Sequence, residues 1–237
     1  MKKMIIDPTF FQVFPEGQVN LLVLNGIDNQ IKESDEQYFY DLLQKSAKEA
    51  HNHLTEDTFT DNEVIAEWRE AFRQFKTKKG ARSSIEALLK RVSQDREFHP
   101  INPLVDIYNS ISLTFAVPCG GEDIETIEGN LVLKKATGGE SFRPLGAEDD
   151  APALPEEIIH ADDKGAICRS LNWREAQRTM LTENTKHAVL VIESIKPRQS
   201  KQADLAMAAM KQLVEDYFQI KTTAHVLNQE QPEAIIV

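Results

Sequence analysis

The sequence predicts an α+β fold in one domain, with helices packed on a mixed sheet. The chain has 237 residues, 41% of them hydrophobic, enough to bury a sizeable core. Helical periodicity dominates up to about residue 113 and strand-like segments follow it, without the regular alternation of a doubly wound fold. No Pro/Gly/Ser-rich linker divides the chain. We expect an N-terminal strand and helix part (1–95), a central core (96–195) and a C-terminal helix and strand (196–237).

Apolar spacing and capping signals give the individual elements. Helices are predicted at 34–50, from 61 or 62 to about 75, at 85–92, from 103 onward and at 200–218. Strands are predicted at 9–14 and 18–25 around a turn at 15–17, and at 131–136, 157–162, 166–173, 187–194 and 222–227. Asn102-Pro103 is a strong helix start, because Asn caps the helix and Pro is tolerated at its first position.

Composition excludes several classes of protein. No apolar run approaches the length of a membrane span, and the N-terminal apolar run is cut by Asp7 and Pro8, unlike a signal peptide. We therefore expect a cytoplasmic protein without membrane association. The two cysteines, Cys119 and Cys168, and the six scattered histidines form no zinc-binding pattern. We expect no metal and no cofactor.

Charge is unevenly distributed along the chain. The net charge is −11, which argues against a general nucleic-acid binder and against DNA as a partner. Residues 69–96 nevertheless carry nine Lys/Arg against three acids. Such a patch could steer a polyanion to one face, or it could be a solvated helix pair with no partner. The residues predicted to contact RNA are Arg73, Lys76, Lys78, Lys79, Arg82, Lys90 and Arg91.

The stretch FHPINPLVDIYNSISL (98–113) places polar side chains on a helix that also has an apolar face. Asp106, Asn109 and Ser110 fall together at i, i+3 and i+4. They could line a pocket, with Asn109 and Ser110 facing it, Asn102 capping the helix and Asp106 fixing neighbouring backbone. They could equally tie helix to sheet through buried hydrogen bonds.

The segment VPCGGED (117–123) predicts a small-residue turn directly after that helix. The amides of Gly120 and Gly121 could bind an oxyanion there, although an ordinary tight turn is the alternative. Cys119 could be a nucleophile, but no neighbouring histidine supports this, and a buried thiol is the simpler interpretation.

A second polar stretch, LNWREAQRTMLTENT (171–185), is dense in hydrogen-bonding groups. Arg174 and Arg178 would suit a carboxylate or phosphate, and Asn172 lies beside them. The alternative is a surface loop whose polar side chains bond their own backbone.

Together these stretches resemble a known family. FHPINPLVDIYNSISL, VPCGGEDIETIEGNLVLKKATGGESFRPLG and EIIHADDKGAICRSLNWREAQRTMLTENTKHAVLVIE are similar, in order and spacing, to the tRNA-binding and editing domain of the bacterial phenylalanyl-tRNA synthetase β chain (its paired third and fourth B modules). WREAFRQF and ARSSIEALLKRV resemble free-standing relatives of that domain. The resemblance implies an editing-domain-like core over 96–195. The chain has no room for the synthetase's catalytic modules.

The resemblance also implies a site. In the synthetase this domain hydrolyses tRNA mischarged with tyrosine. Asn102, Asp106 and Asn109 occupy matching helix positions, and Pro118 matches the proline of the pocket turn. The family's histidine is replaced by Gly120, and its glycine-rich segment with a glutamate by NWREAQRT, which puts Arg178 near the glutamate's place.

Three hypotheses follow for function. In the first, the chain hydrolyses mischarged aminoacyl-tRNA in trans, with Asn109, Gly120 and Gly121 in catalysis and Asn102, Asp106, Ser110, Pro118, Cys119, Asn172, Arg174 and Arg178 binding substrate. In the second, it is a non-catalytic module that binds tRNA or an amino acid. In the third, it is a small-molecule hydrolase or an enzyme dependent on Cys119.

Overall fold

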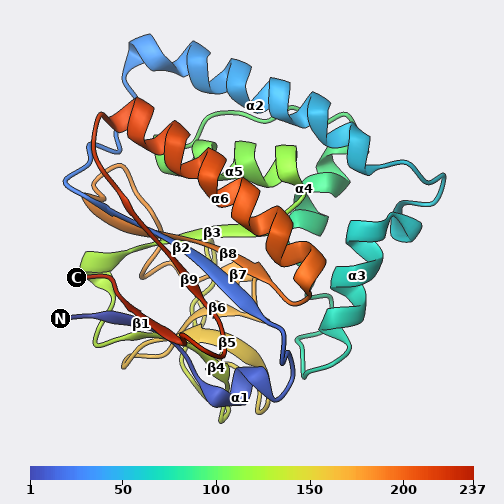
Figure 1. Ribbon diagram of the computed structural model, residues 1–237, viewed down its shortest axis with the longest axis vertical. Helices are drawn as coiled ribbons and strands as arrows, with labels where there is room; N and C mark the ends of the chain where they lie inside the picture. The colour runs from blue at the N-terminus through green and yellow to red at the C-terminus, as the bar shows by residue number, and fades with distance from the viewer.

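Two β-sheets lie face to face beneath a layer of helices in the computed structural model, which describes residues 1–237 (Figure 1). The mixed six-stranded sheet has the order β10 (Glu233–Ile235), β1 (Lys3–Ile6), β4 (Leu131–Lys135), β5 (Ile158–Ala161), β6 (Ala166–Arg169), β7 (Arg174–Glu175). The antiparallel four-stranded sheet has the order β3 (Cys119–Asp123), β8 (His187–Ser194), β2 (Gln18–Asn25), β9 (Thr223–Leu227). Only the β1–β4 pair is parallel, and β1 pairs with β10, so both ends of the chain share one sheet.

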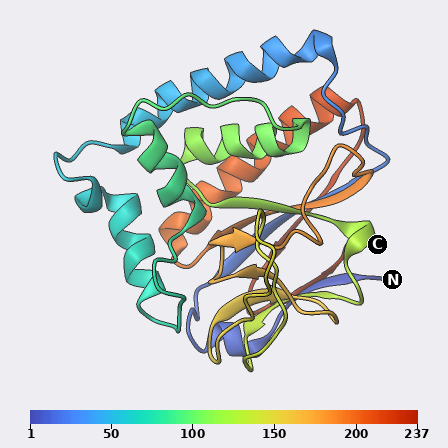
Figure 2. The same ribbon diagram turned by 180° about the vertical axis from the view of Figure 1, so that it is seen from behind.

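Helices α5 (Pro103–Phe115) and α6 (Pro197–Phe218) cover the outer face of the four-stranded sheet (Figures 1 and 2). Helix α2 (Glu36–Ala50) packs on α5, on the side away from the sheet. The others are α1 (Pro8–Phe11), α3 (Glu63–Phe72) and α4 (Ser84–Val92), and short 3₁₀ turns span Glu33–Asp35, His51–His53, Phe59–Asp61 and Ile124–Thr126. No helix, including the 22-residue α6, has the length and apolar character needed to cross a membrane.

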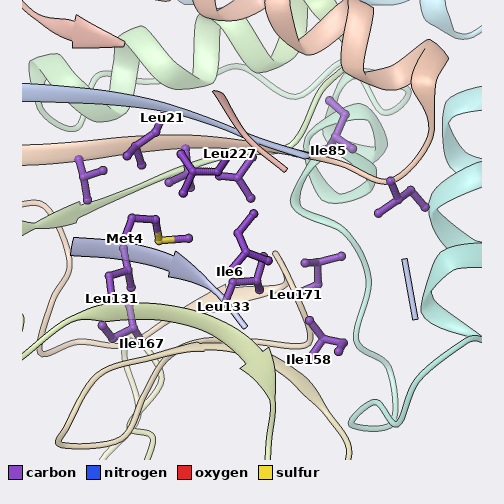
Figure 3. Close-up of a cluster of buried hydrophobic side chains, with 14 of the residues drawn as sticks. Met4, Ile6, Leu21, Ile85, Leu131, Leu133, Ile158, Ile167, Leu171 and Leu227 are labelled. Carbon is purple, nitrogen blue, oxygen red and sulfur yellow. The ribbon is translucent and has the colours of Figure 1, made fainter. Parts of the chain in front are cut away.

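The hydrophobic core has two parts, one between the helices and the four-stranded sheet and one between the two sheets, because successive side chains of a strand point to opposite faces. On β8, Leu190 and Ile192 pack under the helices, whereas Val189 and Val191 face the six-stranded sheet. The interface between the sheets is closed by side chains from both, including Met4, Ile6, Leu131, Leu133 and Ile158 from one and Leu21 and Leu227 from the other (Figure 3). This packing fixes the spacing of the sheets and therefore the dimensions of any space left between them.

The α+β class is confirmed, and most predicted elements are present. The strands at 18–25 and 187–194 are confirmed, and α6 begins at Pro197, three residues before the predicted start. Strand 166–173 is shorter than predicted, because Ser170 and Leu171 have positive φ angles of 48° and 64° that end β6.

Two predictions are wrong. Residues 9–14 are not a strand: Asp7 caps a short helix whose first residue is Pro8, and the first strand is β1. Residues 117–123 are not a turn, because Cys119–Asp123 form the edge strand β3. The glycine there serves close packing: a Cβ on Gly121 would lie 2.6 Å from Leu190 Cδ2 and 2.9 Å from Leu181 Cδ1.

Candidate functional site

A cavity of about 400 Å³ opens between the two sheets, beside α4 and α5. Its size is typical of sites for small ligands. Helix α4 supplies Ser84, Ala87, Leu88 and Arg91, and α5 supplies Tyr108 and Asn109; Cys119, Gly120, Gly121, Glu122, Leu131, Leu145, His160, Cys168, Asn172, Trp173, Arg174, Glu175, Val191 and Glu193 complete the lining. The cavity therefore draws on segments from residue 84 to residue 193.

The interior of the cavity is acidic. Glu122 lies on the edge strand β3, Glu175 on β7 and Glu193 on β8, so three carboxyl groups from three strands converge there. Glu122 and Glu193 are only 5% and 3% exposed. Glu175 is held by the backbone N–H of Gly121, which donates to its Oε1 at 3.4 Å.

Burial perturbs two of these carboxyl groups. It raises the pKa of Glu122 well above its usual value, and the nearby charge of Glu175 acts in the same direction. Burial also raises the pKa of Glu175 to about 7, against the opposing hydrogen bond from Gly121. A carboxyl group with a pKa near neutrality can accept a proton and release it again during a reaction.

The third carboxylate joins the two sheets. His160 Nε2 on β5 lies 2.9 Å from Glu193 Oε1 on β8, and both side chains are at most 4% exposed. Asn172 donates from Nδ2 to the other oxygen of Glu193 at 3.5 Å. Breaking a buried polar network of this kind is costly, so these residues hold the cavity wall in place.

The rim of the cavity has the opposite charge. Arg91 and Arg174 are exposed and line the opening. Two cations lie near the ring of Trp173, with Lys78 Nζ 5.9 Å and Arg174 Cζ 5.3 Å from its centroid. The segment 76–84 reaches this rim because Ser84 N–H donates to the Asn172 carbonyl at 3.0 Å.

Six of the predicted site residues meet at this cavity: Cys119, Gly120, Gly121, Asn109, Asn172 and Arg174. Asn109 is partly buried, and its carboxamide has no hydrogen-bond partner within the protein. The predicted use of both glycine amides needs correction. In β3, Gly121 N–H donates to Glu175 and Asp123 N–H donates to the Thr179 carbonyl, so both groups point away from β8. Because backbone N–H groups alternate in direction along a strand, the N–H of Gly120 points toward β8.

Three of the predicted site residues serve the helix instead. Asn102 Oδ1 accepts from Val105 N–H at 3.1 Å, which confirms the cap, and Asp106 accepts from Ile101 N–H at 3.0 Å, which confirms that it fixes neighbouring backbone. Burial raises the pKa of Asp106 to about 7. Ser110 donates to the Ile107 carbonyl at 2.7 Å and does not face the cavity as predicted, because α5 turns it into the core.

Pro118 and Arg178 lie outside the cavity as well. Pro118 lines a second cavity of about 340 Å³, and Glu193 lines both cavities. Arg178 makes two hydrogen bonds of 2.7 Å with Asp162, so its charge is already paired. Glu175, three residues before Arg178 in the sequence, is the residue of this stretch that supplies a carboxyl group to the cavity.

Cys119 is a poor candidate for a nucleophile. It lines the cavity but is 7% exposed, and burial raises the pKa of its thiol well above the usual value. Since the thiolate is the reactive form, this environment disfavours attack by sulfur. No group of three or more His, Cys, Asp and Glu side chains is placed to hold a metal ion.

Most of the basic residues predicted to contact RNA are exposed. Arg73 is paired with Glu70 at 3.0 Å, and Lys90 is partly buried over the ring of Phe59. The remainder, Lys76, Lys78, Lys79, Arg82 and Arg91, are exposed and form no ion pair. They run from the α3–α4 connection along α4 toward the cavity rim, where Arg91 is part of the lining.

The sequence interpretation missed Tyr108, Glu122, His160, Trp173, Glu175 and Glu193. A signal existed for two of them. His160 and Glu193 occupy inward positions of otherwise apolar strands, IIHA and HAVLVIES, where a polar side chain must find a partner. Glu122 and Glu175 gave no such signal, because β3 was predicted as a turn and β7 has only two residues.

Residues 67–222, more than half of the chain, match the family model of the B3/4 domain. The chain belongs to the B3/4 domain family. The match includes α4, α5, all three strands that carry the cavity carboxylates, and the basic residues beside the rim.

Curated relatives of this B3/4 chain are phenylalanine–tRNA ligase β subunits. That of Cutibacterium acnes is 35% identical over 29% of the chain, and that of Nocardia farcinica 36% identical over 29%. That of Psychrobacter arcticus is 32% identical over 38% of the chain. These alignments span only 8%, 8% and 11% of the relatives' own lengths.

A solved structure supports the fold of the B3/4 chain. An N-terminal fragment of the phenylalanyl-tRNA synthetase β subunit from Pyrococcus horikoshii superposes with a TM-score of 0.50 at 13% identity. The match covers 92% of this chain and 49% of that fragment. The likeness in fold therefore extends beyond residues 67–222 of the family match.

Proposed function

We propose that this chain binds the 3′ end of mischarged aminoacyl-tRNA and hydrolyses its ester in trans. The observation that carries the proposal is the polarity of the site, with unpaired cations on the rim and three carboxyl groups inside. The end of an aminoacyl-tRNA has the complementary polarity, phosphates followed by an α-ammonium group. The resemblance to an editing domain and the relatives' names support tRNA as the carrier.

The rim suits the nucleotide part of the substrate. Lys78, Lys79 and Arg82 supply charge for phosphates. The Trp173 ring offers a surface on which the terminal base can stack, and the two neighbouring cations favour a phosphate beside it. This arrangement would leave the acyl group directed into the cavity.

The interior suits ester hydrolysis. Glu175 would take a proton from a water molecule as that water attacks the carbonyl carbon, and the Asn109 carboxamide would donate to the resulting oxyanion. The C–O bond to the ribose then breaks, and the ribose oxygen takes the proton from Glu175. Asn109 replaces the glycine amides in this role, because Gly121 N–H is occupied by Glu175 and Gly120 N–H is turned toward β8.

A second candidate is binding without turnover. Two observations favour it. The Gly121 amide is already bonded to Glu175, so Asn109 alone is left to donate to an oxyanion. Gly120 also stands where the resemblance places the family's histidine. The two functions differ in one measurable respect, since a binding module protects the ester whereas an enzyme removes it.

The test is deacylation by the purified chain. It is incubated with tRNAs mischarged with tyrosine, serine, threonine, alanine or lysine, and Asn109→Ala and Glu175→Gln variants are run in parallel. Rapid loss of one ester, slowed at least tenfold in each variant, is expected. Retention of every ester while the tRNA is bound would replace the proposal by the binding module.

A further inference from the structure

A leucine is exposed to solvent at the mouth of the cavity. Leu145 lines the cavity and is nevertheless 61% exposed. A single exposed leucine is ordinary on a protein surface. Here, however, the exposed Ala87 and the partly buried Leu88 and Trp173 line the same space. A ligand that enters the cavity therefore meets apolar side chains at the opening.

The backbone holds Leu145 in a fixed position. It lies in a tight turn, in which Ala147 N–H donates to the Pro144 carbonyl at 3.0 Å and Gly146 has a φ of 77°, which glycine adopts without strain. Gln177 clamps this turn, because its Nε2 donates to the Pro144 carbonyl at 2.9 Å and to the Ala147 carbonyl at 2.8 Å. Contact of the leucine with a ligand therefore requires little further ordering of the chain.

The same turn places Leu145 next to the proposed catalytic base, Glu175. Pro144 and Ala176 form an antiparallel β-bridge. Continued by one residue, this antiparallel register sets Leu145 opposite Glu175, and the side chains of both residues line the cavity, as that pairing requires. A group that packs against Leu145 therefore lies close to the carboxyl group that acts on the ester.

The charge around Leu145 decides which part of an RNA can reach it. Residues 143–150 carry three acids and one cation, Arg143, so their net charge is −2. Glu148 and Asp149 are exposed and form no ion pair. Phosphates are attracted to the unpaired cations of the rim and repelled from this segment. The part of an RNA that meets Leu145 is therefore a base or a ribose.

A base suits this place better than a ribose. The faces of a nucleobase stack on aromatic rings and pack against aliphatic side chains, whereas a ribose presents hydroxyl groups. The Trp173 ring lines the same opening and offers the stacking surface. With the base held there, the ribose that carries the ester is directed toward Glu175.

We propose that Leu145 packs against the 3′-terminal base of the tRNA while that base stacks on Trp173, and that this contact sets the ester-bearing ribose beside Glu175. Leu145 is a positioning residue, because it acts through the base and touches none of the reacting atoms. The inference rests on the proposed function for the identity of the RNA, and it adds the contact that recognises the end of that RNA.

The test compares two RNAs that differ only in the terminal nucleoside. Affinity of the full chain is measured by fluorescence anisotropy, at one salt concentration, for a tRNA that carries no amino acid and for the same tRNA without its 3′-terminal adenosine. Removal of the adenosine is expected to weaken binding to the wild type at least tenfold, roughly the contribution of one stacked base. In Leu145→Ser this factor should fall by at least threefold, because serine keeps no apolar contact with the base.

Two further variants separate this contact from general effects of substitution. Leu145→Met keeps an apolar side chain of similar size and should retain most of the factor. Leu205→Ser changes a leucine of α6 that is 60% exposed and lies outside the cavity, so it should leave the factor unchanged. If Leu145→Ser instead weakens the binding of both RNAs equally, the contact is not with the terminal base, and the inference is overturned.

The same comparison distinguishes failure of this inference from failure of the proposed function. If the wild type and Leu145→Ser lose the same factor, of tenfold or more, on removal of the adenosine, Leu145 does not contact the base, while recognition of the 3′ end stands. If the wild type binds both RNAs equally, or neither, the chain does not recognise the 3′ end, and both proposals are wrong.

Discussion

Gly121 on β3 donates its backbone N–H to Oε1 of Glu175 on β7 across 3.4 Å, and so connects the edge of one sheet to the end of the other. The contact determines the roles of both the Gly121 amide and the Glu175 carboxyl group. The amide is no longer free for an oxyanion, and the carboxyl group is held inside the cavity in a defined position. Chemistry at this site therefore centres on Glu175.

Replacing Glu175 by Gln should abolish most of any deacylase activity. Glutamine keeps the shape and the acceptor for Gly121 N–H but cannot take a proton from water. General-base catalysis contributes roughly 10²–10⁴-fold, so a rate loss in that range is expected in single-turnover deacylation. Glu183→Gln, at an exposed position outside the cavity, is the control. Activity within threefold of wild type would show that Glu175 is not the base.

The same substitution should stabilise the protein at alkaline pH. Burial raises the pKa of Glu175 from 4.5 to about 7, so between these values the folded state binds more protons than the unfolded state. Stability therefore falls as pH rises through this window. One pKa unit corresponds to about 1.4 kcal/mol, which sets an upper limit of roughly 3 kcal/mol at pH 8.

The measurement is urea unfolding of both proteins at pH 4.5 and pH 8. Glu175→Gln should be more stable than wild type at pH 8 by about 1–3 kcal/mol and nearly equal to it at pH 4.5. The carboxyl groups of Glu122 and Glu193 and the thiol of Cys168 act on Glu175 or are affected by it, so a Glu122→Gln background serves as a second reference. Equal stability of the two proteins at pH 8 would contradict the raised pKa.

The unpaired basic residues should govern tRNA affinity and its dependence on salt. Each phosphate contact contributes nearly one unit to the slope of log K against log salt. A Lys78→Ala, Lys79→Ala, Arg82→Ala triple variant is expected to weaken tRNA binding at least tenfold and to reduce that slope by about two to three. A Lys45→Ala, Lys48→Ala variant on the exposed face of α2 should leave both quantities unchanged. Equal effects of the two variants would mean that binding is non-specific.

Local signals in the sequence were sufficient for most of the fold. Asn102-Pro103 predicts the start of α5, and the run HAVLVIES predicts β8 with the bounds that the structure has. Both signals, capping and apolar spacing, act within a few residues of the chain. The error at 117–123 has a different origin. Two adjacent glycines indicate a turn locally, but here Gly121 is required by Leu181 and Leu190, which lie about 60 or more residues away in the sequence and meet it only in the folded protein.

The site was predictable only in part for the same reason. Asn109, Asn172 and Arg174 were found from polar density, yet their meeting point depends on the stacking of two sheets. Glu175 was overlooked because its significance comes from burial against Glu122 and Gly121, which no property of NWREAQRT reveals. Arg178 was predicted to bind substrate, because the sequence does not show that it pairs with Asp162, 16 residues away.

Substitutions of Asn102 and Asn109, at the start and in the middle of α5, should affect different properties: the first the stability of the protein, the second its deacylation rate. Asn102 Oδ1 accepts from Val105 N–H and, at 3.0 Å, from Asn29 Nδ2, while Asn29 Oδ1 accepts from Leu104 N–H at 2.9 Å. Asn102→Ala removes the cap and half of this paired arrangement. The free energy of unfolding should fall by about 1–2 kcal/mol, and Asn102→Asp should recover much of the loss, because Asp is an equally good cap.

Asn109→Ala should show the opposite pattern. Its carboxamide makes no bond within the protein, so stability should change by less than about 0.5 kcal/mol, whereas deacylation should slow by roughly 10²–10³-fold if it holds the oxyanion. Chemical unfolding and single-turnover rates of the three variants decide between these roles. If Asn109→Ala unfolds easily but hydrolyses normally, Asn109 ties helix to sheet, and the oxyanion donor must be sought among the other groups of the lining, with the Tyr108 hydroxyl next.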